Sequence, residues 1–213
     1  MATARLDLIV SGTGRCGTGY VSRILQEAGV AAGHEAYYTP SGERHVPGLR
    51  ADVSWLAAPY LRSARQRGAA IACVYRHPAA VISSLMGIRF FDPAMRSEYQ
   101  EFALAHLYPF RLGLPLVDGL PSKESEFEMC CLFYQRWNLL VLQDAHFTFN
   151  IDYPAWDRVA KVLPGMKLAD LASAIPNVSQ TYNHRQRSNI DLNAIPQYVW
   201  DVFQVLEDSA RAS

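Results

Sequence analysis

The sequence has no excess of charge of either sign. Its 213 residues include 20 Lys and Arg and 20 Asp and Glu, so the formal net charge at pH 7 is zero. Proteins that bind nucleic acids usually carry a basic excess, so we do not expect a nucleic-acid partner. An anionic ligand must then be held by local groups rather than by the field of the whole molecule.

Cysteine is scarce, and long apolar runs are missing. The four cysteines are Cys16, Cys73, Cys130 and Cys131, and none belongs to a Cys-x-x-Cys pair. The apolar run at residues 6–10 is interrupted by an aspartate and is too short for a signal-peptide core. No later run approaches the roughly 20 apolar residues of a membrane span. We expect a soluble cytoplasmic protein with free thiols and no membrane partner.

Strand and helix patterns alternate along the chain, which is typical of an α/β fold. Residues 6–11 predict a short buried strand, and residues 69–75, small and apolar throughout, predict a central parallel strand. We predict further strands at 52–55 and 146–151, and helices at 20–28, 56–66, 78–86, 124–143, 156–163 and 196–206. One domain over residues 1–213 is expected: three layers, with a central, mainly parallel sheet flanked by helices. The aromatic and proline-rich stretch at about 89–122 predicts a lid or acceptor lobe.

A glycine-rich loop, Gly12 to Thr18, joins the first strand to the first helix. In such a loop successive backbone N–H groups can point at one anion, and the helix N-terminus adds partial positive charge. Arg15 can clamp an oxygen of a phosphoryl or sulfuryl group, and Thr18 can donate its hydroxyl. The loop therefore predicts an anion site.

Two common nucleotide loops compare poorly with this one. A Walker A loop requires a lysine before its Ser or Thr, and Gly17 stands there instead. Gly12, Gly14 and Gly17 do match the Gly-x-Gly-x-x-Gly dinucleotide pattern, which also needs an acidic residue at the end of the second strand. Glu35 has about the right spacing, but we expect it on a Gly-His-Glu loop rather than after an apolar strand. A nicotinamide enzyme therefore stays open as an alternative.

Two segments resemble the donor-binding motifs of sulfotransferases that use 3′-phosphoadenosine 5′-phosphosulfate. Residues 13–20 (Thr-Gly-Arg-Cys-Gly-Thr-Gly-Tyr) are similar to that family's 5′-phosphosulfate loop. Arg76, at the end of a predicted strand, and Ser84, eight residues later, match the register of its 3′-phosphate motif. The resemblance covers the first half of the chain well and is closest to small bacterial-type members.

The resemblance implies a P-loop-type fold and a transferase activity. A sulfuryl group would pass from 3′-phosphoadenosine 5′-phosphosulfate to the hydroxyl or amine of a small acceptor, without a metal, leaving 3′,5′-adenosine bisphosphate. The implied donor-binding residues are Gly14, Arg15, Cys16, Gly17, Thr18, Gly19, Tyr20, Arg76 and Ser84. Arg15 would also stabilise the leaving group, and Tyr20 would either stack on adenine or belong to the core.

The resemblance implies a general base shortly after the first helix. Glu35 is our first candidate and His34 the second, because sequence alone does not show which side chain points inward. Late in the chain, Arg185 and Arg187 either close over the nucleotide or belong to a solvated loop. We expect His77 only to pack or cap.

Cys16 and Gly19 replace hydroxyl residues of the family loop, and Arg15 replaces its commoner lysine. These departures leave two further alternatives open: a P-loop nucleotide kinase, which would need Mg²⁺, and a non-catalytic module that binds nucleotide. The acidic residues Glu124, Glu126 and Glu128 are expected to form the solvated first turn of a helix.

Overall fold

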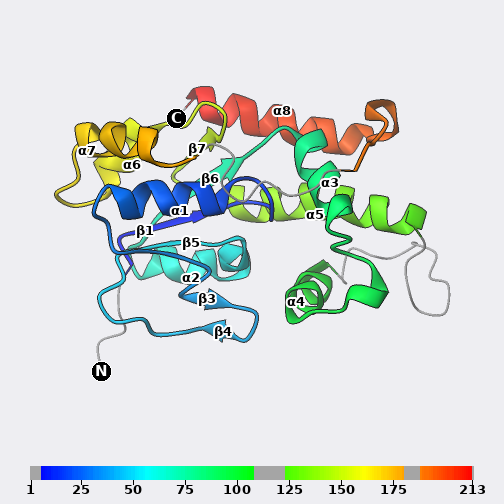
Figure 1. The fold of residues 1–213 in the computed structure, drawn as a ribbon, viewed down its shortest axis with the longest axis horizontal. Coiled ribbons are helices and arrows are strands. Elements are labelled where there is room, and N and C mark those ends of the chain that lie inside the picture. Colours follow the sequence, from blue (N-terminus) through cyan, green and yellow to red (C-terminus); the bar gives the residue numbers. More distant parts are fainter. Residues whose placement is uncertain (1–5, 108–122, 180–187, 213) are drawn as a thin grey trace.

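The computed structural model describes residues 6–107, 123–179 and 188–212. They form an α/β fold around one sheet of five parallel strands (Figure 1). The strand order is β2-β5-β1-β6-β7. The strands are β1 (Leu8–Ser11), β2 (Ala32–His34), β5 (Ala51–Val53), β6 (Ala70–Tyr75) and β7 (Phe147–Asn150). A small antiparallel hairpin, β3 (Tyr38–Thr39) and β4 (Gly42–Glu43), stands apart from this sheet.

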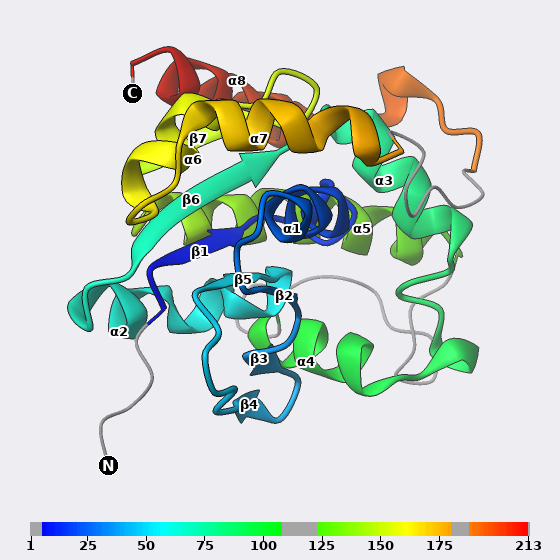
Figure 2. The ribbon, with the colours of Figure 1, turned by 60° about the vertical axis from the view of Figure 1, so that its left-hand side comes forward.

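Helices flank both faces of the sheet (Figure 2). The connection from β1 to β2 through α1 (Thr18–Glu27) and the one from β5 to β6 through α2 (Leu61–Gln66) run in opposite directions along the sheet. Because parallel crossovers are right-handed, α1 and α2 lie on opposite faces. Helix α7 (Leu168–Ala174) packs against α1, and α6 (Trp156–Val162) packs beside α7. The long helix α5 (Lys123–Leu142) packs against β6 and the 3₁₀ helix η1 (Trp55–Tyr60).

The remaining helices are α3 (Pro78–Gly87), α4 (Glu98–Leu107), α8 (Gln197–Ala212) and the 3₁₀ turns Pro93–Met95, Ile175–Asn177 and Leu192–Ala194. The C-terminal helix α8 packs on β7 and α5, and its Glu207 accepts a hydrogen bond of 2.8 Å from the Tyr75 hydroxyl. The described part of the predicted lobe is residues 89–107, with α4; the rest of it lies outside the described residues.

The sequence predictions for the main elements are confirmed. The strands at 6–11, 69–75 and 146–151 and the helices at 20–28, 78–86, 124–143 and 156–163 all appear within a few residues of the expected bounds. The predicted helix 56–66 begins as the 3₁₀ helix η1, and the last helix continues to Ala212. The helix α7 was not predicted.

Two expectations are wrong. Glu35 does not lie on a plain loop, because β2 ends at His34 immediately before it. The strand β2 forms because it pairs in parallel with the neighbouring strand β5. The three-residue segment Ala-Gly-His does not predict a strand by itself. Glu126 is buried rather than solvated, with 7 % of its surface exposed, whereas Glu128 is exposed. Packing around the start of α5, not the helix dipole alone, decides the environment of that turn.

All four cysteines are free, as predicted, and all four are buried. Among the helices that the structure describes, none combines the length and the apolar character needed to cross a membrane.

Candidate functional site at the carboxyl edge of the sheet

The loop between β1 and α1 sits at the carboxyl ends of the parallel strands, where open α/β sheets bind ligands. Two of its residues have a left-handed backbone, Arg15 with φ 75° and Gly17 with φ 105°. Gly17 directly precedes α1 and is its N-cap. The loop therefore turns sharply onto the helix N-terminus, with its N–H groups near the positive end of the helix dipole.

Two loop glycines are required by close packing. A Cβ atom added to Gly12 would lie 1.9 Å from the carbonyl oxygen of Val74, and one added to Gly17 would lie 2.5 Å from the side chain of Ile151. At Gly14 an added Cβ would make ordinary contacts with the Phe133 ring at 3.4 Å and the Trp55 ring at 3.8 Å. Gly12 and Gly17 thus let the loop lie directly on β6 and on the residue after β7.

The two sequence motifs meet in space. The Arg15 Nε donates a hydrogen bond of 3.0 Å to the Ser84 Oγ, although the two residues are 69 positions apart. Ser84 lies on α3 and is almost fully buried. Because a hydroxyl both accepts and donates, Ser84 can take this bond from Arg15 and still donate its own proton to a ligand oxygen.

Arg76 follows β6 and faces the same edge. Its guanidinium approaches the Asp152 carboxylate at 3.7 Å, and its side chain is 24 % exposed. The Nε atom of Arg76 is buried and has no hydrogen-bond partner among the described residues. Its carbonyl accepts a bond of 2.9 Å from the Tyr134 hydroxyl, which ties the end of β6 to α5. A buried charged donor without a partner is costly, so this atom is suited to meet an anion.

Ser188 lies against α3 next to Ser84. Its backbone N–H donates to the Ser83 carbonyl at 3.0 Å, and its carbonyl accepts a bond from the Ser83 hydroxyl. Arg185 and Arg187, predicted to close over a nucleotide, lie outside the described residues. The chain that carries them rejoins the described fold beside the Ser84 helix.

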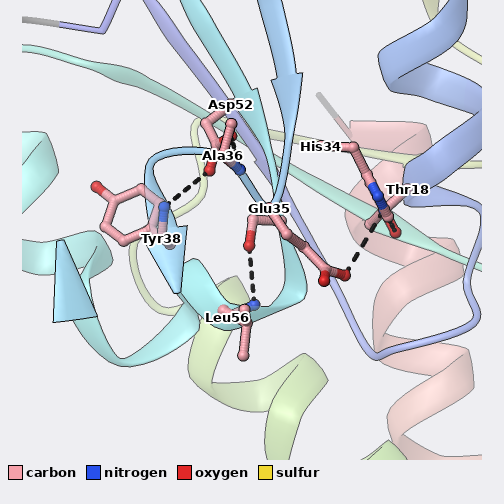
Figure 3. A network of polar contacts seen from close by, with 8 residues as sticks. Thr18, His34, Glu35, Ala36, Tyr38, Asp52 and Leu56 are labelled. Atoms are coloured by element: carbon pink, nitrogen blue, oxygen red, sulfur yellow. Dashed lines mark hydrogen bonds and ion pairs between the residues drawn. The ribbon is translucent and has the colours of Figure 1, made fainter. Parts of the chain in front are cut away.

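The two candidate bases lie beside the loop (Figure 3). The Thr18 hydroxyl and the His34 Nε2 are 3.2 Å apart, and the same nitrogen is 3.7 Å from the Glu35 carboxylate. Thr18, His34 and Glu35 thus form a short polar chain from the first turn of α1 to the end of β2. Glu35 has φ 54°, a left-handed conformation that is rare outside glycine.

Burial tunes the ionisation of this chain. Burial, and next the negative charge of Asp52, raise the pKa of Glu35 to about 7, against a hydrogen bond from the Trp55 side chain and the charge of Arg15. Burial, and then Arg15, lower the pKa of His34. A carboxyl group with a pKa near 7 is well matched to accept a proton at neutral pH.

Asp52 is a residue of the site that the sequence analysis missed. It is fully buried in the middle of β5, and its two carboxylate oxygens accept the N–H groups of Ala36 at 3.0 Å and Tyr38 at 3.2 Å (Figure 3). The available signal was an aspartate inside a short apolar strand, where this residue type is depleted.

The other predicted residues divide by burial. Cys16 and Gly19 are buried, and burial raises the pKa of the Cys16 thiol to about 12, so this cysteine is no nucleophile at neutral pH. Tyr20 is half-buried and packs against the core, so its stacking role stays a prediction. The His77 ring packs against those of Trp200 and Phe203, as expected, with ring centres 5.4 and 5.3 Å apart.

Aromatic rings of the lobe and of α5 surround Trp55 next to Glu35. The rings within 6.4 Å of Trp55 are those of Phe90, Tyr99, Phe102, Phe133 and Trp137. Burial raises the pKa of the Tyr99 phenol, and the negative charge of Glu35 is the next largest cause of that rise. The candidate base therefore borders a largely apolar wall.

The strand order bears on the dinucleotide alternative. In the common dinucleotide fold the second strand lies next to the first. Here β5 separates β2 from β1, so Glu35 ends an edge strand rather than the neighbour of the loop strand. The Gly-x-Gly-x-x-Gly match therefore lacks its usual setting.

No protein-family model matches the sequence, and no curated protein matches it.

Proposed function

We propose that this protein is a sulfotransferase with a P-loop-type fold. It would move a sulfuryl group from 3′-phosphoadenosine 5′-phosphosulfate to the hydroxyl or amine of a small acceptor. The contact between Arg15 and Ser84 carries the proposal, because it joins the two segments that resemble the family's 5′- and 3′-phosphate motifs. Each segment alone is a weak match.

The residues at this edge fit such a donor. Arg15, Thr18 and the loop N–H groups would bind the 5′-phosphosulfate, and Arg76 and Ser84 would bind the 3′-phosphate. The buried Arg76 Nε, which has no hydrogen-bond partner among the described residues, supports an anionic ligand there. An arginine fork is suited to two phosphate oxygens at once.

In the proposed reaction the acceptor oxygen or nitrogen forms a bond to sulfur as the bond from sulfur to the bridging oxygen of the 5′-phosphate breaks. The electron pair of the broken bond stays on that oxygen, giving 3′,5′-adenosine bisphosphate. Glu35 takes the acceptor proton, which its pKa of about 7 suits. Arg15 offsets the charge that grows on the leaving phosphate, as cations do in phosphoryl transfer.

The recognition of a 3′-phosphate separates this proposal from a kinase or a nicotinamide enzyme. We expect 3′,5′-adenosine bisphosphate to bind at least about tenfold more tightly than ADP without magnesium, because losing a desolvated charged partner costs on the order of 2–5 kcal/mol. Arg76→Ala should erase most of this preference and leave ADP affinity nearly unchanged. Calorimetric titration of both ligands measures it.

Arg62→Ala is the matched control, since Arg62 is 75 % exposed and lies away from the loop on α2. It should retain the preference. Equal affinity of the wild type for both ligands, or a strict requirement for magnesium, would exclude the sulfotransferase and favour the kinase. Tight binding of the bisphosphate without turnover over a panel of acceptors would point to the non-catalytic module.

A further inference from the structure

The turn that carries Glu35 is built around one buried carboxylate. Asp52 pairs in register with Gly33 of β2 and Ile9 of β1, and its side chain is fully buried. Its oxygens accept the N–H groups of Ala36 and Tyr38, which lie one and three residues after Glu35. These bonds fix the backbone immediately after the candidate base.

Gly33 makes room for this arrangement. A Cβ atom there would lie 3.0 Å from the Asp52 Oδ1 and 2.4 Å from the Ala36 Cβ. Glu35 itself donates its N–H to the Val53 carbonyl at 3.3 Å, so β5 holds the turn on both sides of the base. The left-handed backbone of Glu35, which is unfavourable in a non-glycine residue, persists because these contacts outweigh its cost.

We infer that Asp52 is a positioning residue for Glu35: it fixes the turn that aims the base at the phosphate loop, and it places a negative charge beside that base. The inference rests on the proposed function only in treating Glu35 as the base. A buried carboxylate whose role was confined to the turn would hold the backbone but would not alter how Glu35 titrates.

The groups that face Glu35 come from four elements. They are Arg15 of the loop, His34 of β2, Asp52 of β5 and Tyr99 of α4. Burial raises the pKa of Asp52 as well as that of Glu35, against the N–H bonds that lower the pKa of Asp52. When both carboxyls are ionised, each negative charge opposes the other.

The test is a carboxyl ¹³C NMR titration of the ligand-free chain, with Glu35→Gln used to assign the Glu35 signal. Asp52→Asn, which removes the charge and keeps the shape, should lower the midpoint of Glu35 by about one pH unit. The Ala36 and Tyr38 amides should exchange about tenfold faster or more, as expected for a lost hydrogen bond to a charged group. Asp7→Asn, at an aspartate paired with Arg50 away from this turn, should change neither.

An unchanged Glu35 midpoint in a folded Asp52→Asn protein would overturn the inference. If that variant does not fold, Glu35→Gln still decides: because the coupling of two charges is reciprocal, this variant must lower the midpoint of Asp52. An unchanged Asp52 midpoint would overturn the inference. None of these readouts uses the donor, so a failed sulfotransferase assay with the expected titration would reject the proposed function and leave the role of Asp52 standing.

Discussion

Arg15 and Glu35 each hold a left-handed backbone conformation without being glycine. Both side chains take part in the candidate site, Arg15 through Ser84 and Glu35 through the chain to His34 and Thr18. Strained residues of this kind persist only where their surroundings fix them, and they cluster at functional sites. At the scale of single residues, the site is therefore more rigidly built than its loop sequence indicates.

The two candidate bases differ in their surroundings. The His34 Nε2 already contacts the Thr18 hydroxyl, whereas the Glu35 carboxylate borders the apolar wall around Trp55. We predict that Glu35→Gln cuts turnover by roughly 10²–10⁴-fold, the usual contribution of a general base, and leaves binding of 3′,5′-adenosine bisphosphate nearly intact. Steady-state kinetics and calorimetry measure the two effects.

His34→Gln is the control for this prediction and should cost much less turnover than Glu35→Gln. A Glu35→Gln enzyme that works at full speed would end the assignment of Glu35. A larger loss in His34→Gln than in Glu35→Gln would transfer the role of base to the histidine.

The loop between β1 and α1 packs closely against two neighbouring strands of the sheet. Gly12 lies against the backbone of β6 with no space for a methyl group, and Gly17 lies against Ile151 after β7. The loop therefore keeps its shape because two neighbouring strands press on it. The loop glycines are therefore required by close packing as well as by the close approach of a ligand.

We predict that Gly12→Ala lowers the free energy of unfolding by about 3 kcal/mol, because its Cβ would lie 1.9 Å from the Val74 carbonyl, which belongs to the sheet backbone and yields little. Gly14→Ala, whose Cβ would lie in ordinary contact with the rings of Phe133 at 3.4 Å and Trp55 at 3.8 Å, should stay within about 1 kcal/mol of the wild type. Urea unfolding of both variants checks this. Equal effects would mean that the loop adapts freely.

For the whole molecule, two buried carboxyls make stability depend on pH in an unusual direction. Folding raises the pKa of Glu35 from 4.5 to about 7 and that of Asp52 from 3.8 to about 6. A carboxyl whose pKa is raised in the folded state stabilises the fold fully below its unfolded pKa. That contribution is lost as the pH rises through the folded value. The lowered pKa of His34 acts in the opposite direction.

We therefore predict that Glu35→Gln removes part of the loss of stability between pH 5 and pH 8. Relative to the wild type, the variant should gain about 1–3 kcal/mol of unfolding free energy at pH 8 compared with pH 5, since one pKa unit corresponds to about 1.4 kcal/mol. Denaturant titrations at the two pH values measure the difference. A parallel dependence in both proteins would show that Glu35 titrates normally.

The α/β class, the buried central strand, the glycine loop and most helices could be predicted from the sequence alone. Each of these follows from a local pattern: apolar runs for β6, helical spacing for α1 and α5, and the proline that starts α3. The spaced motifs of the sequence also predict that Arg15, Arg76 and Ser84 bind one ligand. Their donor specificity stays a prediction.

Which side chains contact one another could be learned only from the tertiary structure. The bond from Arg15 to Ser84 spans 69 residues, β2 exists because β5 pairs with it, and Glu126 is buried by what packs on α5. Asp52 acquires its role from two N–H groups of a turn 14 to 16 residues away. Pairing, burial and pKa depend on neighbours distant in sequence, and a local pattern carries no information about which neighbours the fold will supply.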